Sequence, residues 1–373
     1  MIFLSIIISL ALGMYLTAPV ITVFHELGHA LTMVALTKTD QVDVYIGSYG
    51  NQNTPARFKI GKLQFYVNIN PTINIRGMCR PSQIEGNYVK QSIILLAGPI
   101  ISFLFAVVIG AIIFNTELHG VIKLYAFVLL ICSFISCFQN IVPRTLSSGL
   151  YNDGKQLRFV YKLKSSYVEY VAALEQFGEG HFEQAAEQFI RLNEKFPYQE
   201  MIIRPLSLSL LQLKRFEEAR VFVEFLEKYT VFTVADCINR GYIESIEGKR
   251  EEALKYFERA VSIDRRQPIA LNNLAYELIL KENYDKAGSL LKRAIEIAPD
   301  LAEAHDNLGH LKILKGELEE GKMLLEQAIK LNPNLAGAYL HLGIYYKKVD
   351  HIELAEQHFN KAKELDPDVI IPD

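Results

Sequence analysis

The strongest constraint on the fold is a period of 34 residues that runs through the second half of the chain. A small residue recurs at this interval, and a bulky apolar residue follows each one four positions later. The small residues are Ala185, Ala219, Ala253, Ala287, Gly321 and Ala355, and the apolar ones are Phe189, Val223, Phe257, Leu291, Leu325 and Phe359. Positions four apart share one face of a helix. Six units in one register predict a solenoid of stacked helix pairs.

This pattern resembles the tetratricopeptide repeat, and prolines end four of the units, at Pro197, Pro299, Pro333 and Pro367. We predict six such repeats over residues 166–369, the first two degenerate, after a connector at residues 158–165. The resemblance implies that a protein partner binds in a groove lined by the first helix of each repeat. The register places these residues in the groove: Ile238, Tyr242, Asn272, Tyr276, Asp306, His310, Leu340 and Ile344.

Three apolar segments occupy the first half of the chain, at residues 2–36, 93–114 and 124–142. A helix of roughly 20 apolar residues crosses a bilayer, so we predict three transmembrane helices. The first segment is too long for one straight span, and Gly13 and Pro19 are its expected points of bend or break. A signal peptide is the alternative for this segment, but it has no basic region at its start.

The loop at residues 37–90, between the first two apolar segments, alternates apolar and polar residues and is interrupted by glycine and proline. Alternation with a period of two indicates short strands with one buried face. The apolar positions are Val42, Val44, Ile46, Phe58, Ile60, Leu63, Phe65, Val67, Ile69, Ile73 and Ile75. We therefore predict a small antiparallel sheet in this loop.

The first apolar segment contains the sequence FHELGHA at residues 24–30, with Glu26 as its only acidic or basic residue besides histidine. On a helix, His25 and His29 lie on one face and can bind one zinc ion, while Glu26 lies beside them and can activate a water molecule. An ordinary helix with the same letters is the alternative. We favour the zinc site, because an ionisable residue within a membrane span is costly to bury and usually has a function.

A catalytic zinc site usually has three protein ligands, so a third is needed. Asp153 is the candidate, since it follows the third apolar segment closely and would lie at the depth of the two histidines. An Asp before a Gly is also common in turns, and spacing alone leaves both interpretations open. Asn152 is the weaker substitute as a ligand.

Residues 1–160 resemble the site-2 protease family of intramembrane zinc metalloproteases (the M50 peptidases). The resemblance rests on FHELGHA at residues 24–30, on Ala-Gly-Pro at residues 97–99, and on Asn140 and Pro143 followed by an Asp-Gly pair at residues 153–154. One departure is that nine residues separate Pro143 from the Asp-Gly pair, more than the family usually has.

The resemblance implies a role for each matching residue. His25, His29 and Asp153 would bind Zn²⁺, Glu26 would activate the attacking water, and Asn140 would lie beside the active site. Because of the longer spacing, Asp153 would approach from a loop rather than from a continuous helix.

The distribution of basic residues predicts the orientation in the membrane. The loop at residues 37–90 has seven Lys and Arg residues, whereas the connection at residues 115–123 has only Lys123. The positive-inside rule therefore places the sheet and everything after the third span in the cytoplasm. With three spans both regions fall on the same side, and the active site lies at the cytoplasmic end of its helix.

These expectations combine into one predicted architecture. A membrane α-helical core of three transmembrane helices, with the sheet insertion at residues 37–90, forms a domain at residues 1–160. An all-α tetratricopeptide repeat solenoid follows at residues 166–369. Basic residues do not cluster with aromatic residues, so we expect a lipid bilayer and proteins as partners, and no nucleic acid.

The predicted function is that of an intramembrane zinc metalloendopeptidase, which would cleave membrane-associated or transmembrane protein substrates. The cytoplasmic repeats would bind the substrate or a regulator. Two alternatives remain open. One is a catalytically silent, membrane-anchored repeat scaffold, and the other is a zinc peptidase acting on soluble or membrane-associated peptides. A structural zinc site has no need of a carboxylate that is not a ligand, so Glu26 favours catalysis.

Overall fold

A computed structural model describes the backbone of residues 2–47, 54, 56–68, 77–146 and 149–372. The chain divides into two compact units, Met1–Leu213 and Lys214–Asp373. The boundary between them lies within the second predicted repeat, rather than between residues 160 and 166. Each unit is described separately below.

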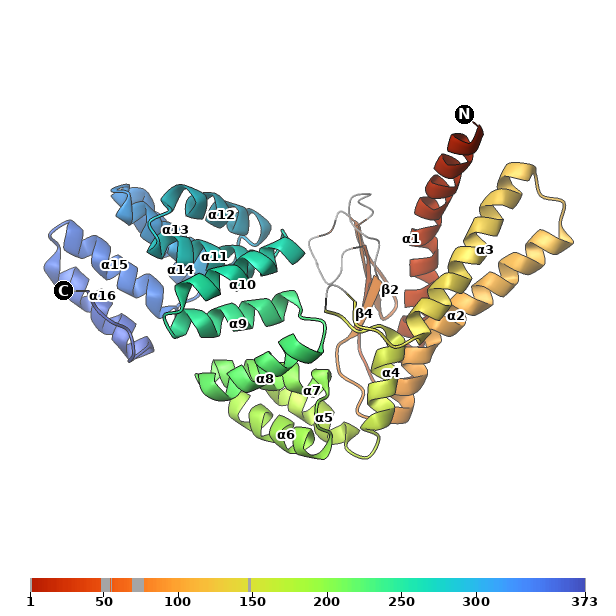
Figure 1. Ribbon diagram of the computed structural model, residues 1–373, viewed down its shortest axis with the longest axis horizontal. Helices are drawn as coiled ribbons and strands as arrows, with labels where there is room; N and C mark the ends of the chain where they lie inside the picture. Colours follow the sequence, from red (N-terminus) through yellow and green to blue (C-terminus); the bar gives the residue numbers. More distant parts are fainter. Residues whose placement is uncertain (1, 48–53, 55, 69–76, 147–148, 373) are drawn as a thin grey trace. The chain divides into compact units, whose positions relative to one another are not determined.

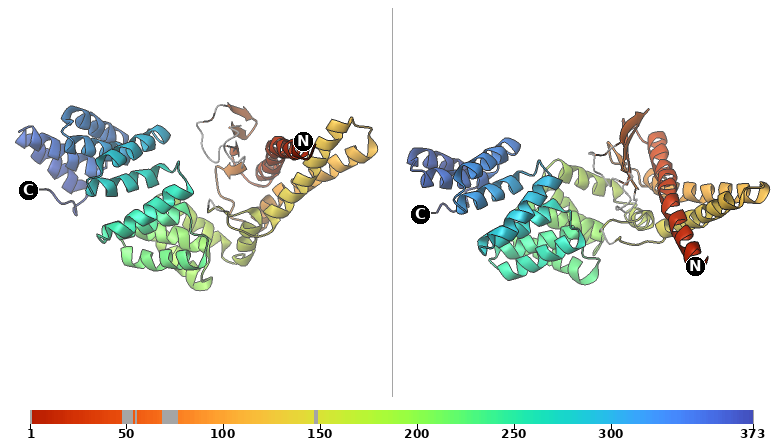
Figure 2. Two further views of the ribbon diagram at one scale, coloured as in Figure 1. Left: turned by 45° about the horizontal axis from the view of Figure 1, so that its top comes forward. Right: turned by 90° about the horizontal axis from the view of Figure 1, so that it is seen from above.

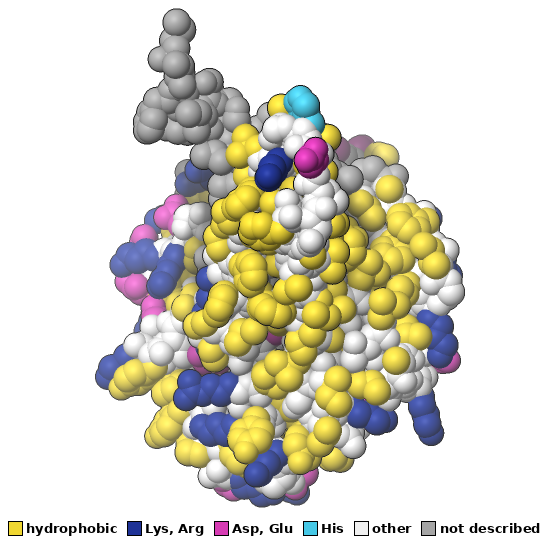
Figure 3. Space-filling view, turned by 90° about the vertical axis from the view of Figure 1, so that its right-hand side faces the viewer, with side chains coloured by type: hydrophobic (Ala, Val, Ile, Leu, Met, Phe, Trp, Pro, Cys, Tyr) yellow, Lys and Arg dark blue, Asp and Glu magenta, His cyan; other side chains and the backbone are white. Residues whose placement is uncertain are grey.

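The first unit begins with three long helices, α1 (Ile2–Leu36), α2 (Tyr88–Asn115) and α3 (Gly120–Ile141). All three pack against one another (Figure 1). Each contains a stretch long and apolar enough to cross a membrane: Tyr15–Leu36, Tyr88–Asn115 and Gly120–Ile141. Hydrophobic side chains cover most of the face that α2 and α3 present in Figure 3. The expected break in the first segment is absent, because α1 continues as a helix through Gly13 and Pro19.

A four-stranded sheet lies alongside α1 (Figures 1 and 2). Its strands are β1 (Val42–Ile46), β2 (Ala56–Ile60), β3 (Leu63–Val67) and β4 (Gly77–Pro81), in the spatial order β2-β3-β1-β4. The prediction of an antiparallel sheet was wrong in one pairing, since β1 and β3 are parallel. The pairs β2–β3 and β1–β4 are antiparallel.

Burial explains this strand order. Both β1 and β3 bury alternate side chains, among them Val42, Val44 and Phe65, in a core shared with α1. All five residues of β2 are exposed, so β2 can only be an edge strand. The two more buried strands therefore pair at the centre of the sheet. The predicted strand residues Ile69, Ile73 and Ile75 lie outside the described residues.

The first unit ends with four shorter helices, α4 (Asp153–Lys162), α5 (Tyr167–Gly178), α6 (Phe182–Lys195) and α7 (Glu200–Gln212). The connector expected at residues 158–165 is largely the second half of α4. This helix is amphipathic, and it packs against both α2 and α3. It therefore joins the long helices to the first repeat helices as part of the packed structure.

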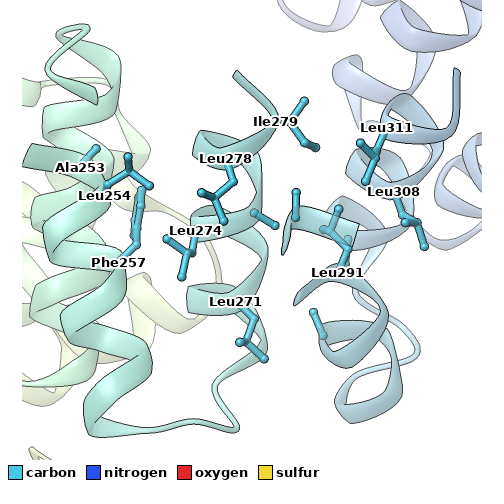
Figure 4. Close-up of a cluster of buried hydrophobic side chains, with 14 residues drawn as sticks. Ala253, Leu254, Phe257, Leu271, Leu274, Leu278, Ile279, Leu291, Leu308 and Leu311 are labelled. Carbon is cyan, nitrogen blue, oxygen red and sulfur yellow. The ribbon is translucent and has the colours of Figure 1, made fainter. Parts of the chain in front are cut away.

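The second unit consists of consecutive helices along the rest of the chain. They are α8 (Phe216–Tyr229), α9 (Val234–Ile246), α10 (Arg250–Ile263), α11 (Pro268–Leu280), α12 (Tyr284–Ile297), α13 (Ala302–Leu314), α14 (Leu318–Leu331), α15 (Ala336–Lys348) and α16 (Ile352–Leu365). The small residues of the period, such as Ala253 and Ala287, are fully buried where neighbouring helices meet. A continuous apolar core runs from α10 to α13 (Figure 4).

The core of the second unit yields a first prediction. Leu291 is fully buried in the cluster of Figure 4, whereas Leu314 at the end of α13 is 38% exposed. We expect Leu291→Ala to lower the free energy of unfolding of the fragment Lys214–Asp373 by about 3 kcal/mol, because a cavity remains in a packed core. Leu314→Ala is the control and should cost under about 1 kcal/mol. Urea denaturation followed by circular dichroism measures both, and equal losses would contradict the assignment of the core.

Candidate metal centre

Three side chains of the first unit converge on one point inside the helical core. The Nε2 atoms of His25 and His29 lie 3.2 Å apart, and each faces a different oxygen of Asp153, at 3.1 Å and 3.4 Å. The three groups offer ligand atoms that all lie within 4.8 Å of one another. The structure therefore brings together the three residues that the sequence proposed as metal ligands, although they are up to 128 positions apart.

The opposite nitrogen of each imidazole is bonded to α2. His29 Nδ1 donates to the carbonyl oxygen of Ile94 at 2.7 Å, and His25 Nδ1 contacts Ser102 Oγ at 3.1 Å. A carbonyl oxygen only accepts, so Nδ1 of His29 carries a hydrogen and Nε2 can present its lone pair to the centre. Such outer contacts fix the tautomer and the ring orientation of histidines that bind metals.

The chemistry of these donors fits a cation. Two buried imidazoles and a partly buried carboxylate, all electron-rich, lie within contact distance of one another, and a positive charge between them would relieve their repulsion. Two histidines and one carboxylate form a known ligand set of catalytic zinc sites, which keep a further position for water or substrate. The residues present therefore fit zinc.

Glycines allow α1 and α2 to approach closely enough to build this centre. A Cβ atom on Gly98 would lie 2.3 Å from His29 Nε2, and one on Gly28 would lie 2.7 Å from the carbonyl oxygen of Ala97. Both glycines belong to the motifs that the sequence analysis singled out. Their role is thus spatial: the backbone of α2 occupies the room that a side chain at Gly28 would need, and the His29 ring occupies the room beside Gly98.

Asp153 is the first residue of α4, and the residues on either side of it fix its position. The Asn152 side chain caps α4 by accepting from Lys155 N, also accepts from Arg144 N, and donates to two carbonyl oxygens at the end of α3, those of Gln139 and Val142. Both polar atoms of the Asn152 side chain are thus hydrogen-bonded to the backbone, so Asn152 is not placed as a ligand.

Gly154 brings α4 against the end of α3. A Cβ atom on Gly154 would lie 1.8 Å from the carbonyl oxygen of Ile141, so no other residue fits without movement of the backbone. This contact explains why the Asp is followed by Gly. The longer loop after Pro143 is accommodated before α4 begins, and Asp153 itself lies on the first turn of a helix.

Glu26 is buried beneath the sheet and is not one of the converging ligands. A Cβ atom on Gly77 of β4 would lie 2.2 Å from Glu26 Cγ, so the backbone of β4 passes directly against this side chain. The Cys79 thiol donates to the backbone oxygen of Glu26 at 3.2 Å. Burial raises the pKa of Cys79 well above its usual range, which keeps the thiol protonated as a donor.

Sequence reasoning missed several of these residues. It did not predict β4, Cys79 or the contact of Ser102 with His25, although Ser102 follows Gly98 by one helical turn and this spacing could have identified it. Asn140 lies beside the first turn of α4, since a Cβ atom on Gly154 would lie 3.0 Å from its backbone oxygen. Its Nδ2 donates back to the oxygen of Ser136 within α3, at 3.0 Å, and so it caps its own helix turn.

The predicted groove of the second unit also differs in detail. Asn272 and Asp306 are buried, and each bonds to a side chain of the next repeat, Asn307 and His341 respectively. An apolar row remains exposed along the first helices of the repeats, formed by Tyr242, Ile246, Tyr276, Leu280 and Leu314.

The close approach at Gly98 generates a second prediction. We expect Gly98→Ala to displace the His29 ring and to weaken zinc binding by roughly tenfold or more, since even outer contacts of metal ligands matter by 10–100-fold. Competition with a chromogenic zinc chelator in detergent measures the affinity. Gly86→Ala is the matched control, because a Cβ atom at Gly86 meets nothing within 4 Å. Unchanged affinity in Gly98→Ala would contradict the description of this contact.

Comparisons with known proteins concern the repeats. Residues 247–302, 302–335 and 336–369 match the tetratricopeptide repeat family. No curated protein matches the chain. Similar solved structures include a MamA fragment from Desulfovibrio magneticus RS-1, which is 22% identical over 44% of this chain and 94% of its own, with a TM-score of 0.35.

Another is YrrB, described as a tetratricopeptide repeat protein with an unusual peptide-binding site. It is 21% identical over 49% of this chain and 94% of its own, with a TM-score of 0.34. At these values we transfer no property of either protein. The family matches confirm the prediction of tetratricopeptide repeats in the C-terminal region of the chain.

Proposed function

We propose that this protein is a zinc-dependent intramembrane endopeptidase of the site-2 protease type, which uses its repeats to bind a protein substrate or regulator. The observation that supports the metal site is the convergence of His25, His29 and Asp153, with both outer imidazole nitrogens already bonded to α2. Zinc held by these three residues would supply the Lewis acid for peptide hydrolysis.

The chain's own residues account for the other requirements. Glu26 would take a proton from the attacking water on a carboxylate oxygen and deliver it to the leaving amine. It is suited to this role because it follows a ligand directly on α1 and is not itself a ligand. Ser102 and the Ile94 carbonyl would orient the two imidazoles. Asn140 receives no direct role, since its side chain bonds to its own helix.

The family matches concern the repeats alone. A membrane-anchored repeat scaffold for protein binding, the alternative function, would contain the same repeats. That alternative has the support of the comparisons. What favours an enzyme is the N-terminal site. A scaffold requires neither three converging ligands, two of them buried histidines, nor a fourth ionisable side chain, Glu26, buried beside them. A peptidase that acts on soluble or membrane-associated peptides would use the same residues.

The repeats would provide the binding surface for a protein partner. Solenoids of this kind bind along the surface formed by successive repeats. The exposed apolar row from Tyr242 to Leu314 would contact apolar side chains of the partner. Large exposed apolar surfaces of soluble domains often mark such interfaces.

We further propose a multi-pass location in the cell membrane, with the sheet, the metal centre and the repeats on the cytoplasmic side. The three apolar stretches support this topology, as does the seven-to-one ratio of basic residues between residues 37–90 and residues 115–123.

The metal site is tested by zinc content and proteolysis. Purified wild-type protein should bind about one zinc per chain, and His25→Ala, His29→Ala and Asp153→Ala should each lose most of it, because three ligands are the usual minimum. Glu26→Gln should retain the metal and lose proteolysis by at least about 100-fold, since general base catalysis contributes 10²–10⁴-fold. Atomic absorption and cleavage of a transmembrane test peptide measure the two properties. Full activity in Glu26→Gln would refute the role of Glu26 as the base, whereas a wild-type chain with neither zinc nor proteolysis would leave the scaffold function.

The topology has a separate test in cells. In a chain without its four natural cysteines, Glu117→Cys should react with a membrane-impermeant maleimide applied from outside. Lys59→Cys in β2 and Glu258→Cys in the repeats should react only after the cells are opened. Labelling of Glu258→Cys in intact cells would reverse the proposed orientation.

A further inference from the structure

A polar cluster connects the metal centre to the first repeat helices. Glu200, the first residue of α7, accepts from Lys155 Nζ at 2.6 Å and from Arg204 NH1 at 2.9 Å. Lys155 lies two residues after Asp153, on the first turn of α4. The three charged side chains are only 16–25% exposed, so they are more strongly coupled than a surface pair.

The same cluster holds the loop between α3 and α4. Arg204 also contacts the Tyr151 hydroxyl, and Lys155 contacts Thr145 Oγ1. Thr145 and Tyr151 form an antiparallel bridge that closes this loop, supported by a hydrogen bond from Leu146 N to Leu150 O at 2.7 Å. The loop contains the additional residues that separate Pro143 from the Asp-Gly pair. Tyr151 of this loop thus contacts α7 directly, and Thr145 is linked to Glu200 of α7 through Lys155.

The ionised Glu200 carboxylate attracts the two cations of the cluster, Lys155 and Arg204. Burial acts to raise the pKa of Glu200, but hydrogen bonds from Lys155 and Arg204 lower it below the usual value. Glu200 is therefore a carboxylate at neutral pH and holds two cations, one on α4 and one on α7. Without it, Lys155 and Arg204 would remain close together with no acid between them.

We propose that Glu200 is a positioning residue for the third metal ligand, and that the helices α5–α7 are part of the support of the metal centre. The ion pair with Glu200 fixes Lys155. Lys155 and Asp153 both lie on the first turn of α4, so the ion pair also fixes the position of Asp153. A partner that shifts α7 would thereby change the position of Asp153 and regulate the site. This inference rests on the proposed metal site.

The test measures zinc affinity of the full-length chain in detergent, by competition with a chelator. Glu200→Gln, which keeps the size of the side chain and removes its charge, should weaken zinc binding by roughly tenfold. Glu169→Gln is the matched control, because it breaks a similar ion pair, with Lys195 at 2.8 Å, at an exposed place on α5. It should leave the affinity unchanged. Tyr151→Phe is a milder second variant, and it should weaken binding by a smaller factor.

A double-variant cycle separates positioning from general destabilisation. If Glu200 acts through Asp153, Glu200→Gln should have no further effect on zinc affinity when Asp153→Ala is already present. Equal weakening in both backgrounds would overturn the proposal, as would wild-type affinity in both Glu200→Gln and Tyr151→Phe. Absence of zinc from the wild-type chain would instead refute the metal site itself, and with it this inference.

Discussion

Two imidazole nitrogens 3.2 Å apart, facing one carboxylate, need firm support from outside the group they form. Here the support is the close contact of α1 with α2. It exists because Gly28 and Gly98 leave no side chain between the two backbones. The Ile94 carbonyl and Ser102 can then reach the outer nitrogen of each ring. If the helices were separated by one methyl group, the rings would lose both their partners and their common orientation.

The sequence predicted the parts of this site that depend on local geometry. Helical spacing placed His25 and His29 on one face, and the position of Asp153 after the third apolar segment placed it at the same depth. The contacts of Ser102 and Cys79 depend on how separate elements pack, and single-sequence patterns contain little information on packing. The same limit explains the error in the sheet, where the burial pattern identified β1 and β3 but not the direction in which they pair.

The repeats were predictable because their period repeats one local pattern of helix packing. The division of the chain after Leu213 was not predictable, because the first repeat helices contact different elements from those that the other repeat helices contact. Phe159 of α4 packs against Tyr170 of α5, with ring centroids 5.0 Å apart, and Phe159, Val160 and Leu163 are buried. The end of a solenoid exposes an apolar face that must be covered. Here α4 packs against α5, so the helix that carries Asp153 also covers the first of the repeat helices.

The engagement of Asn152 has a chemical consequence. Its amide nitrogen donates to the oxygens of Gln139 and Val142, while its oxygen accepts from two backbone nitrogens. Conversion to aspartate, as in spontaneous deamidation, exchanges one NH₂ group for an oxygen of almost the same size. Two attractions would become repulsions between oxygens, at the place where α3 meets α4. A carboxylate at this position would therefore weaken the junction, and loss of a single amide nitrogen through chemical ageing would loosen the attachment of the helix that carries the third ligand.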